Sequence, residues 1–247
     1  MAQAPLTAPP NRLLGALSKP VWEEVRPHCD NVALKLGHLL QEGGEPIERI
    51  YFPTSGVISS VAVFNGGRAA EMATTGPEGM VDIGAVLGAE TALSRNLVQV
   101  TGSALVMEFD TFCRLRDEVP EFKTILLWYA QAFMAQVMQS VACNAVHSLE
   151  ERAARWLLMC HDRTNREKFS LTQEFLAEMI GVSRPALNTV ARALQRAGLI
   201  RYVRGAVTVE DREGLEASSC ECYEIIRKHY DVRLFRALSN AGGDQAV

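Results

Sequence analysis

The stretch LTQEFLAEMIGVSRPALNTV, residues 171–190, has the pattern of two short helices joined by a tight turn. Thr172 stands where an N-cap side chain would accept a backbone N–H of the first helix. Gly181 follows the apolar repeat of that helix, where the chain commonly adopts a left-handed conformation as it leaves a helix. Ser183 precedes the second helix as its cap, and Pro185 is tolerated because the first turn needs no N–H donor. The segment predicts a helix-turn-helix.

The second helix has one apolar face and one polar face. The residues left outside its apolar face are Arg184, Asn188, Thr189, Arg192 and Gln195. An arginine near the N-terminus of a helix in the DNA major groove can bind guanine, and an asparagine one turn later can read adenine. After the helix, Leu199–Val203 and Ala206–Val209 alternate like strands around Arg204-Gly205, which predicts a two-stranded wing.

The charge distribution favours a surface that binds phosphate. Five arginines and no acidic residue lie between Glu178 and Glu210, although the whole chain has a formal net charge of −4. Residues 150–212 carry 11 basic and 8 acidic side chains, whereas residues 1–149 carry 10 basic and 15 acidic ones. Such segregation predicts contact with nucleic acid. The alternative is a helical hairpin and β-ribbon whose charged face is merely solvated.

The segment from about residue 150 to 212 resembles the winged helix of the Crp/Fnr superfamily of bacterial transcription regulators. The resemblance is carried by Leu171-Thr172, Gly181-Val182-Ser183-Arg184 and Ala197-Gly198-Leu199-Ile200. It implies that Arg184 contacts a guanine. The family commonly has an acidic residue next and a second arginine one turn on, where this chain has Pro185 and Thr189. The family's usual half-site is therefore not implied.

We predict a homodimeric regulator that binds a palindromic double-stranded DNA site, with a recognition helix at about Ser183–Gln195 and a wing at about Leu199–Val209. The predicted DNA-binding residues are Thr172, Gln173, Ser183, Arg184, Asn188, Thr189, Arg192, Arg201 and Arg204. The resemblance alone implies contact with RNA polymerase. The alternative is a small-molecule-sensing module whose winged helix engages protein rather than DNA.

The amino-terminal half reads as short strands separated by glycine-rich turns. The predicted strands are Val32–Leu36, Ile50–Phe52, Gly56–Phe64, Ala69–Thr74, Leu97–Val100 and Ala104–Phe109, with a tight hairpin at Asn65-Gly66-Gly67. Glu42-Gly43-Gly44-Glu45-Pro46, followed by Ile50-Tyr51-Phe52 and Gly56, resembles the cyclic-nucleotide-binding β-roll of the same superfamily. The predicted fold class is α+β, with a jelly-roll-like β-roll sensor domain, a long dimerisation helix and a winged helix-turn-helix.

The effector site departs from the family pattern. Nucleotide-binding members place a glutamate after a glycine and an arginine shortly downstream, where this chain has Ile83 and then Ser94 or Arg95. The candidate ligand-binding residues are Gly79, Ile83, Gly84, Ser94 and Arg95. The alternative is that Gly76–Gly88 is only a structural corner. Cyclic AMP is not supported, and an effector of unknown identity stays open.

A long helix is predicted from Pro120 to Asn144 or beyond, because apolar residues occupy more than one of its faces. Packing one face on the sensor domain and another on a second copy would bury both; an ordinary core helix of a monomer is the alternative. Ser148-Leu-Glu-Glu151 has the pattern of a capping box, which places a hinge at Ser148. The predicted domains are residues 12–115 (sensor), 120–147 (dimerisation helix) and 148–235 (winged helix with an amphipathic helix over Asp211–Phe235).

The six cysteines show no disulfide or zinc spacing, as expected in a reducing cytoplasm. Cys143 and His147 are four residues apart, which suits a metal or haem, but a buried structural pair is favoured because no third ligand is nearby in sequence. On a helix, Cys220 and Cys222 would face apart and make a poor chelate. We therefore predict no metal and no cofactor.

The sequence argues against an enzyme and against a membrane span. It contains no nucleophile elbow, P-loop, zinc-protease motif or dinucleotide fingerprint. Residues 124–149 lack a formal charge, but their longest unbroken apolar stretch is only Ile125–Ala130. A cytoplasmic location is expected.

Overall fold

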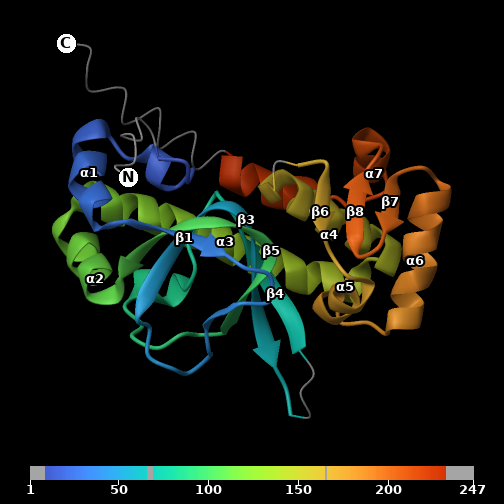
Figure 1. Cartoon of the computed structure of the whole chain (residues 1–247), viewed down its shortest axis with the longest axis horizontal. Helices are drawn as coiled ribbons and strands as arrows, with labels where there is room; N and C mark the ends of the chain where they lie inside the picture. Colours follow the sequence, from blue (N-terminus) through green and yellow to red (C-terminus); the bar gives the residue numbers. More distant parts are fainter. Residues whose placement is uncertain (1–8, 66–68, 165, 232–247) are drawn as a thin grey trace.

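The computed structural model describes residues 9–65, 69–164 and 166–231. The glycines of the predicted Asn65-Gly66-Gly67 hairpin and the last four residues of the predicted domain 148–235 lie outside these ranges. The chain forms two halves connected by a long helix that runs behind the amino-terminal sheet (Figure 1). This is the predicted α+β architecture.

The amino-terminal half is a five-stranded antiparallel sheet of order β1-β5-β3-β4, with β2 also paired to β5. Its strands are β1 (Asp30–Leu34), β2 (Leu39–Gln41), β3 (Arg49–Val63), β4 (Ala69–Thr75) and β5 (Arg95–Glu108). Short helices cover one end of this sheet: η1 (Leu14–Ala16), α1 (Lys19–Val25), η2 (Arg26–His28), η3 (Ile83–Leu87) and α2 (Phe109–Glu118).

Two of the predicted strand breaks are wrong. Ile50–Phe52 and Gly56–Phe64 belong to the single strand β3, and Leu97–Val100 and Ala104–Phe109 fall largely within the single strand β5. The two long strands pair along their length through register shifts around Ser55. A Cβ atom added at Gly56, whose φ is +89°, would lie 2.6 Å from the Val100 carbonyl oxygen. Glycine here permits a bulge within a continuous strand pair rather than a turn.

The long helix α3 (Pro120–Val146) confirms the predicted element, and α4 (Leu149–Thr164) follows it after a short break. His147 is extended, with ψ 149°, so the two helices are not continuous. The predicted capping box is present: the Ser148 N–H donates to Glu151 Oε2 at 2.8 Å, and the Glu151 N–H donates to Ser148 Oγ at 3.3 Å. The break therefore lies at the predicted hinge.

The carboxy-terminal half contains α5 (Gln173–Ile180), α6 (Arg184–Arg196) and a three-stranded sheet of order β6-β8-β7. The strands β7 (Ile200–Val203) and β8 (Ala206–Val209) are the predicted wing. The strand β6 (Lys168–Ser170) is not among the predicted strands.

The predicted continuous helix over Asp211–Phe235 is wrong in one respect. The helix α7 (Arg212–Ala217) ends, the chain turns through residues 218–221, and residues 222–231 are again helical. Leu215, Tyr223, Ile226 and Tyr230 are buried. The Tyr230 hydroxyl donates to Gln136 Oε1 of α3 at 3.0 Å, so this extension also packs against the long helix.

Buried polar contacts connect the two halves. Trp156 of α4 donates its indole N–H to Glu71 of β4 at 2.8 Å. Arg163, also on α4, donates to Glu78 at 2.6 Å and to Gln136 at 3.1 Å. Arg163 and Glu78 are both buried.

Among the described helices, none is long and apolar enough to cross a lipid bilayer.

Candidate DNA-binding surface

The helix-turn-helix is held by local contacts of the kind predicted from the sequence. Thr172 Oγ1 accepts the Phe175 N–H at 3.2 Å, and Gly181 ends α5 with a φ of +76°. Pro185 lies in the first turn of α6. The prediction that the Ser183 side chain caps α6 is wrong: Ser183 is the N-cap residue, but its hydroxyl makes no capping hydrogen bond. The exposed hydroxyl is free to meet another group.

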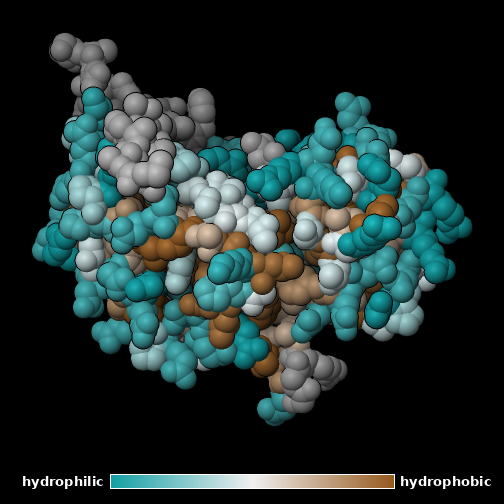
Figure 2. Space-filling view, in the orientation of Figure 1, coloured by the Kyte–Doolittle hydropathy of each residue, from teal (hydrophilic) through white to brown (hydrophobic). Residues whose placement is uncertain are grey.

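The outward face of α6 carries unpaired positive charge. Arg184, Arg192 and Arg196 are exposed, and none of them forms an ion pair with another described residue. Figure 2 shows a largely hydrophilic surface at the end of the molecule where Figure 1 places α6. A helix face of this kind is complementary to phosphate and to the acceptor atoms of guanine.

Two residues of the predicted outward face are only partly exposed. The Oδ1 atom of Asn188 is buried and has no hydrogen-bond partner among the described residues. Gln195 Oε1 accepts the Tyr202 N–H at 3.0 Å and thereby ties α6 to β7. Thr189 is exposed, and its hydroxyl donates to the Pro185 carbonyl oxygen at 3.2 Å. Asn188 therefore offers chiefly its amide N–H groups to a partner.

The wing turns at Arg204-Gly205, where both residues have positive φ, +50° and +74°. Consecutive left-handed residues are the geometry of a tight hairpin that follows the twist of its strands. The Leu171 N–H donates to the Gly205 carbonyl oxygen at 2.8 Å, which places the start of α5 beside the wing. The structure thus brings Thr172 and Gln173 close to this turn. Arg201 instead pairs with Glu210 at 2.5 Å, so its charge is already compensated.

The match to known families lies in this same region. Residues 151–218 match the model of the Crp-like helix-turn-helix domain. Residues 151–218 are therefore a Crp-like helix-turn-helix domain. This match covers the helices α4 to α7 and the wing, and hence the whole candidate surface. A search of curated proteins found no match to the chain.

Solved structures extend the likeness from the Crp-like domain to the whole architecture. FixK2 from Bradyrhizobium japonicum is 12% identical, with a TM-score of 0.66, over 78% of this chain and 98% of that one. CLP, the c-di-GMP-responsive global regulator of Xanthomonas campestris, is 15% identical, with a TM-score of 0.62, over 77% and 98%. A CRP/FNR-family regulator of Thermus thermophilus is 21% identical, with a TM-score of 0.62, over 79% and 98%. At these identities the likeness establishes the Crp/Fnr fold.

A Crp-like helix-turn-helix carried on a Crp/Fnr fold is the architecture of a DNA-binding transcription regulator. These matches do not favour the alternative in which the winged helix engages protein, and they argue against an enzyme.

The candidate effector residues of the amino-terminal half are engaged in internal contacts. A Cβ atom at Gly79 would lie 2.1 Å from the Tyr129 ring, and one at Gly84 would lie 2.9 Å from Leu93. Ile83 packs against the main core. Ser94 uses its carbonyl oxygen to accept from Asn96. Arg95 pairs with Glu42 at 2.7 Å.

A buried acid lies at the same corner and was not singled out from the sequence. The backbone of Asp82 has a left-handed conformation, with a φ of +63°, and its Oδ1 accepts a hydrogen bond from the Asn96 side-chain amide at 3.0 Å. Burial raises the pKa of Asp82 to about 7, although the Asn96 hydrogen bond acts in the opposite direction. Its other oxygen, Oδ2, has no partner within the described residues.

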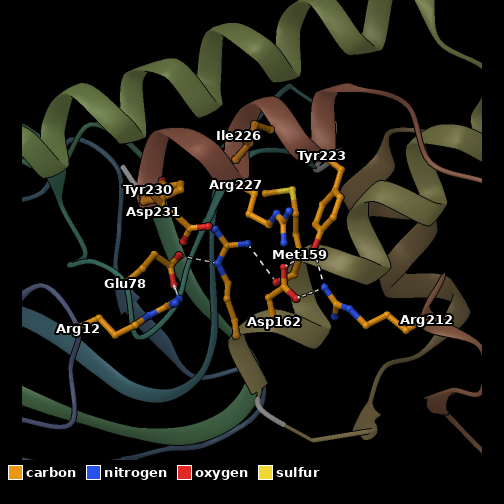
Figure 3. Close-up of a pocket in the computed structure, with 11 residues that line it drawn as sticks. Arg12, Glu78, Met159, Asp162, Arg212, Tyr223, Ile226, Arg227, Tyr230 and Asp231 are labelled. Carbon is orange, nitrogen blue, oxygen red and sulfur yellow. Dashed lines mark hydrogen bonds and ion pairs between the residues drawn. The ribbon is translucent and has the colours of Figure 1, made fainter. Parts of the chain in front are cut away.

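A cavity of about 210 Å³ lies where the two halves meet the final helix (Figure 3). It is lined by side chains from the amino terminus, α4, α7 and residues 222–231, four of them arginines. Each guanidinium has a carboxylate: Arg12 and Arg163 pair with Glu78, Arg212 with Asp162 and Glu216, and Arg227 with Glu224. The arginines of this cavity are therefore paired within the chain rather than free to bind an anion, and the Arg163–Glu78 pair joins the two halves.

The structure also brings together four side chains that the sequence separates. The ligand atoms of Cys143, His147, Cys220 and Cys222 all lie within 4.8 Å of one another. No third ligand lies near Cys143 and His147 in sequence, but the fold supplies Cys220 and Cys222. The expectation that Cys220 and Cys222 face apart holds only if both lie on one helix, and Cys220 lies in the turn before the final helix. Folding, not sequence spacing, assembles this cluster.

Proposed function

We propose that the protein is a homodimeric, sequence-specific regulator of transcription that binds double-stranded DNA. The observation that carries the proposal is the outward face of α6, where exposed arginines that have no carboxylate partner among the described residues extend from a Crp-like helix-turn-helix. Such a face has affinity for the phosphate backbone and can read guanine in the major groove. The protein would act in the cytoplasm, and contact with RNA polymerase would follow from its family.

The proposed base contacts come from the start of α6, the recognition helix at about Ser183–Gln195. Arg184 is the first residue of that helix and would bind guanine O6 and N7. Asn188 would act through its amide N–H groups, because its Oδ1 is buried. Ser183 and Thr189 would lie at the edge of this contact between α6 and the bases of the major groove.

The proposed backbone contacts surround that helix. Thr172 and Gln173 stand at the start of α5 beside the wing turn that carries Arg204, and Arg192 lies two turns along α6 from Arg184. These residues would position the duplex through its phosphates. Arg201 contributes less than the others, because Glu210 already balances its charge.

Dimerisation through α3 is supported by an apolar stripe that one copy leaves uncovered. The exposed fractions are 53% for Met134, 67% for Met138, 67% for Val141 and 75% for Val146. Their spacing along the helix places them on adjoining faces, whereas Leu126 and Tyr129 on the other side are buried in the core. Covering the stripe with the same helix of a second copy would place two recognition helices about one turn of DNA apart.

The proposed functional division follows the predicted domains: residues 12–115 as sensor, 120–147 as dimerisation helix and 148–235 as DNA-binding domain, with the hinge at Ser148. An effector would act by favouring one arrangement of the two halves over another.

The experiment that tests the proposal is selection of binding sites from a random duplex library, with purified protein and then with added cell metabolites. We expect enrichment of an inverted repeat, and loss of that enrichment in Arg184→Ala but not in Arg114→Ala, a surface arginine of α2. A folded dimer that enriches no sequence under either condition would overturn the proposal.

A further inference from the structure

Four potential metal ligands meet at the boundary between the dimerisation helix and the DNA-binding domain. Cys143 lies in the last turn of α3 and His147 directly follows that helix. Cys220 and Cys222 belong to the turn and first helical residue that follow α7. The three cysteines are buried and form a cluster of their own, apart from the main core, while the His147 side chain is 15% exposed.

The distances among the four ligand atoms suit one tetrahedral ion. Cys143 Sγ lies 3.5 Å from Cys220 Sγ, and His147 Nδ1 lies 3.5 Å from Cys222 Sγ. A tetrahedral zinc ion with bonds to sulfur of about 2.3 Å separates its ligands by about 3.8 Å. All six separations are at most 4.8 Å, so coordination requires only small side-chain movements.

The residues around the four ligands have the chemistry of an outer shell. His147 directs Nδ1 at the cysteines and holds Glu221 Oε2 against Nε2 at 3.2 Å, the carboxylate–histidine pairing found behind metal-bound imidazoles. Gln139 donates to Cys222 Sγ at 3.1 Å, as a donor does to a coordinating thiolate.

We propose that Cys143, His147, Cys220 and Cys222 bind one Zn²⁺ ion per protomer in a closed Cys₃His site. Three thiolates and one imidazole are a set typical of structural zinc, and four protein ligands leave no position for a substrate. A disulfide explains fewer of the observations: it would join two of the sulfurs at about 2.05 Å and give no purpose to the convergent imidazole and its carboxylate.

The ion would join the end of α3 to the segment after α7, across the hinge at Ser148. Because only this arrangement of the halves completes the ligand set, binding would favour it over any other. On the proposed function, zinc occupancy would then set which orientation of the recognition helix is available to DNA. This consequence depends on DNA binding, whereas the metal site itself does not.

The test is titration of metal-free, reduced, full-length protein with Co²⁺, followed by displacement with Zn²⁺. We expect one Co²⁺ per protomer, with the strong visible and near-ultraviolet bands of tetrahedral cobalt thiolate, and a rise in Tm with Zn²⁺. Cys143→Ser and Cys222→Ser should lose these bands, while Cys113→Ser, a cysteine of α2 outside the cluster, should keep them. Glu221→Gln should retain the bands with an affinity about 10–100-fold weaker.

A second measurement uses the unaltered protein, in case the serine variants do not fold. Cysteine alkylation followed by mass spectrometry should show that Zn²⁺ protects Cys143, Cys220 and Cys222 but leaves the reactivity of Cys29 unchanged. Absence of stoichiometric binding, equal binding by the cluster variants and Cys113→Ser, or a Cys143–Cys220 disulfide in freshly isolated protein would overturn the site. A protein that binds zinc but selects no DNA sequence would overturn only the proposed function.

Discussion

Glu71 of β4 accepts the indole N–H of Trp156 of α4 at 2.8 Å, so a strand of the amino-terminal sheet and the first helix of the Crp-like domain share a partly buried carboxyl group. Ser59 donates to the same carboxyl group at 2.7 Å. Burial raises the pKa of Glu71 to about 7 in spite of these two hydrogen bonds and the charges of Arg155 and Arg163. The contact between the halves is therefore sensitive to protonation near neutral pH.

We expect the free energy of unfolding to fall as pH rises from about 4.5 to about 7, because folded Glu71 retains a proton there that the unfolded chain has released. Above about pH 7 the free energy of unfolding keeps the reduced value, because Glu71 is then ionised in the folded protein as well, at an unfavourable cost that no longer changes with pH. Glu71→Gln should remove this part of the pH dependence and stabilise the protein at pH 8 by up to about 3 kcal/mol. Urea unfolding at several pH values measures both effects. Glu24→Gln, at an exposed position of α1, should change neither, and a Glu71→Gln profile parallel to the wild type would contradict the assignment.

Removing Arg163 should weaken the same boundary strongly. Its guanidinium and Glu78 are both buried, and Arg163→Met would leave the Glu78 carboxylate with only the longer ion pair to the more exposed Arg12, at a cost of about 3 kcal/mol. The double variant Glu78→Gln, Arg163→Met should recover most of that loss. Arg114→Ala, which breaks an exposed ion pair with Glu118, should cost less than about 1 kcal/mol. Denaturant unfolding measures the free energy of unfolding of each variant. If Arg163→Met and the double variant lost the same free energy, the Arg163–Glu78 pair would not be the cause of the loss.

Arg184→Ala should weaken binding to the selected DNA site by about 1–3 kcal/mol and relax the preference at one base pair of each half-site. Arg192→Ala should instead weaken binding to all sequences alike and reduce the salt dependence by about one counterion. Fluorescence anisotropy over a salt series, with the selected site and its single-base variants, separates the two effects. If Arg184→Ala changed neither affinity nor preference, α6 would not be the recognition helix.

Charge placed on the exposed stripe of α3 should prevent dimerisation. Met138→Glu would put a carboxylate where the proposed interface excludes water, and sedimentation should show a monomer with an unaltered circular dichroism spectrum. Leu36→Glu, at an exposed apolar position of the amino-terminal half, should leave the oligomeric state unchanged. A Met138→Glu protein that sediments as wild type would place the interface elsewhere.

Elements determined by contacts a few residues apart could be predicted from the sequence. The Thr172 cap, the left-handed Gly181 and the Ser148–Glu151 capping box depend on neighbouring residues, and all three are present. The cap by the Ser183 side chain was wrong because an N-cap residue can occupy its position without using its hydroxyl.

Features decided by distant partners could not be predicted. The sequence predicts that a strand begins at Gly56. In the structure β5 passes close to Gly56, and the glycine lies at a bulge inside the continuous strand β3. The three residues of β6 are too few to show an alternation and become a strand by pairing with β8. Cys143 and Cys220 are 77 residues apart, so only the folded chain shows that their sulfurs meet.

The hydroxyl of Thr172 has one proton and two lone pairs, and the helix cap uses a lone pair. The proton remains available at an exposed position beside the wing, where it can be given to a phosphate oxygen. An aspartate at this position would cap the helix equally well, but its negative charge would repel the phosphates of the duplex. The same hydroxyl oxygen therefore caps the start of α5 and can also donate a hydrogen bond to the duplex, and only a side chain able to accept and donate at once can do both.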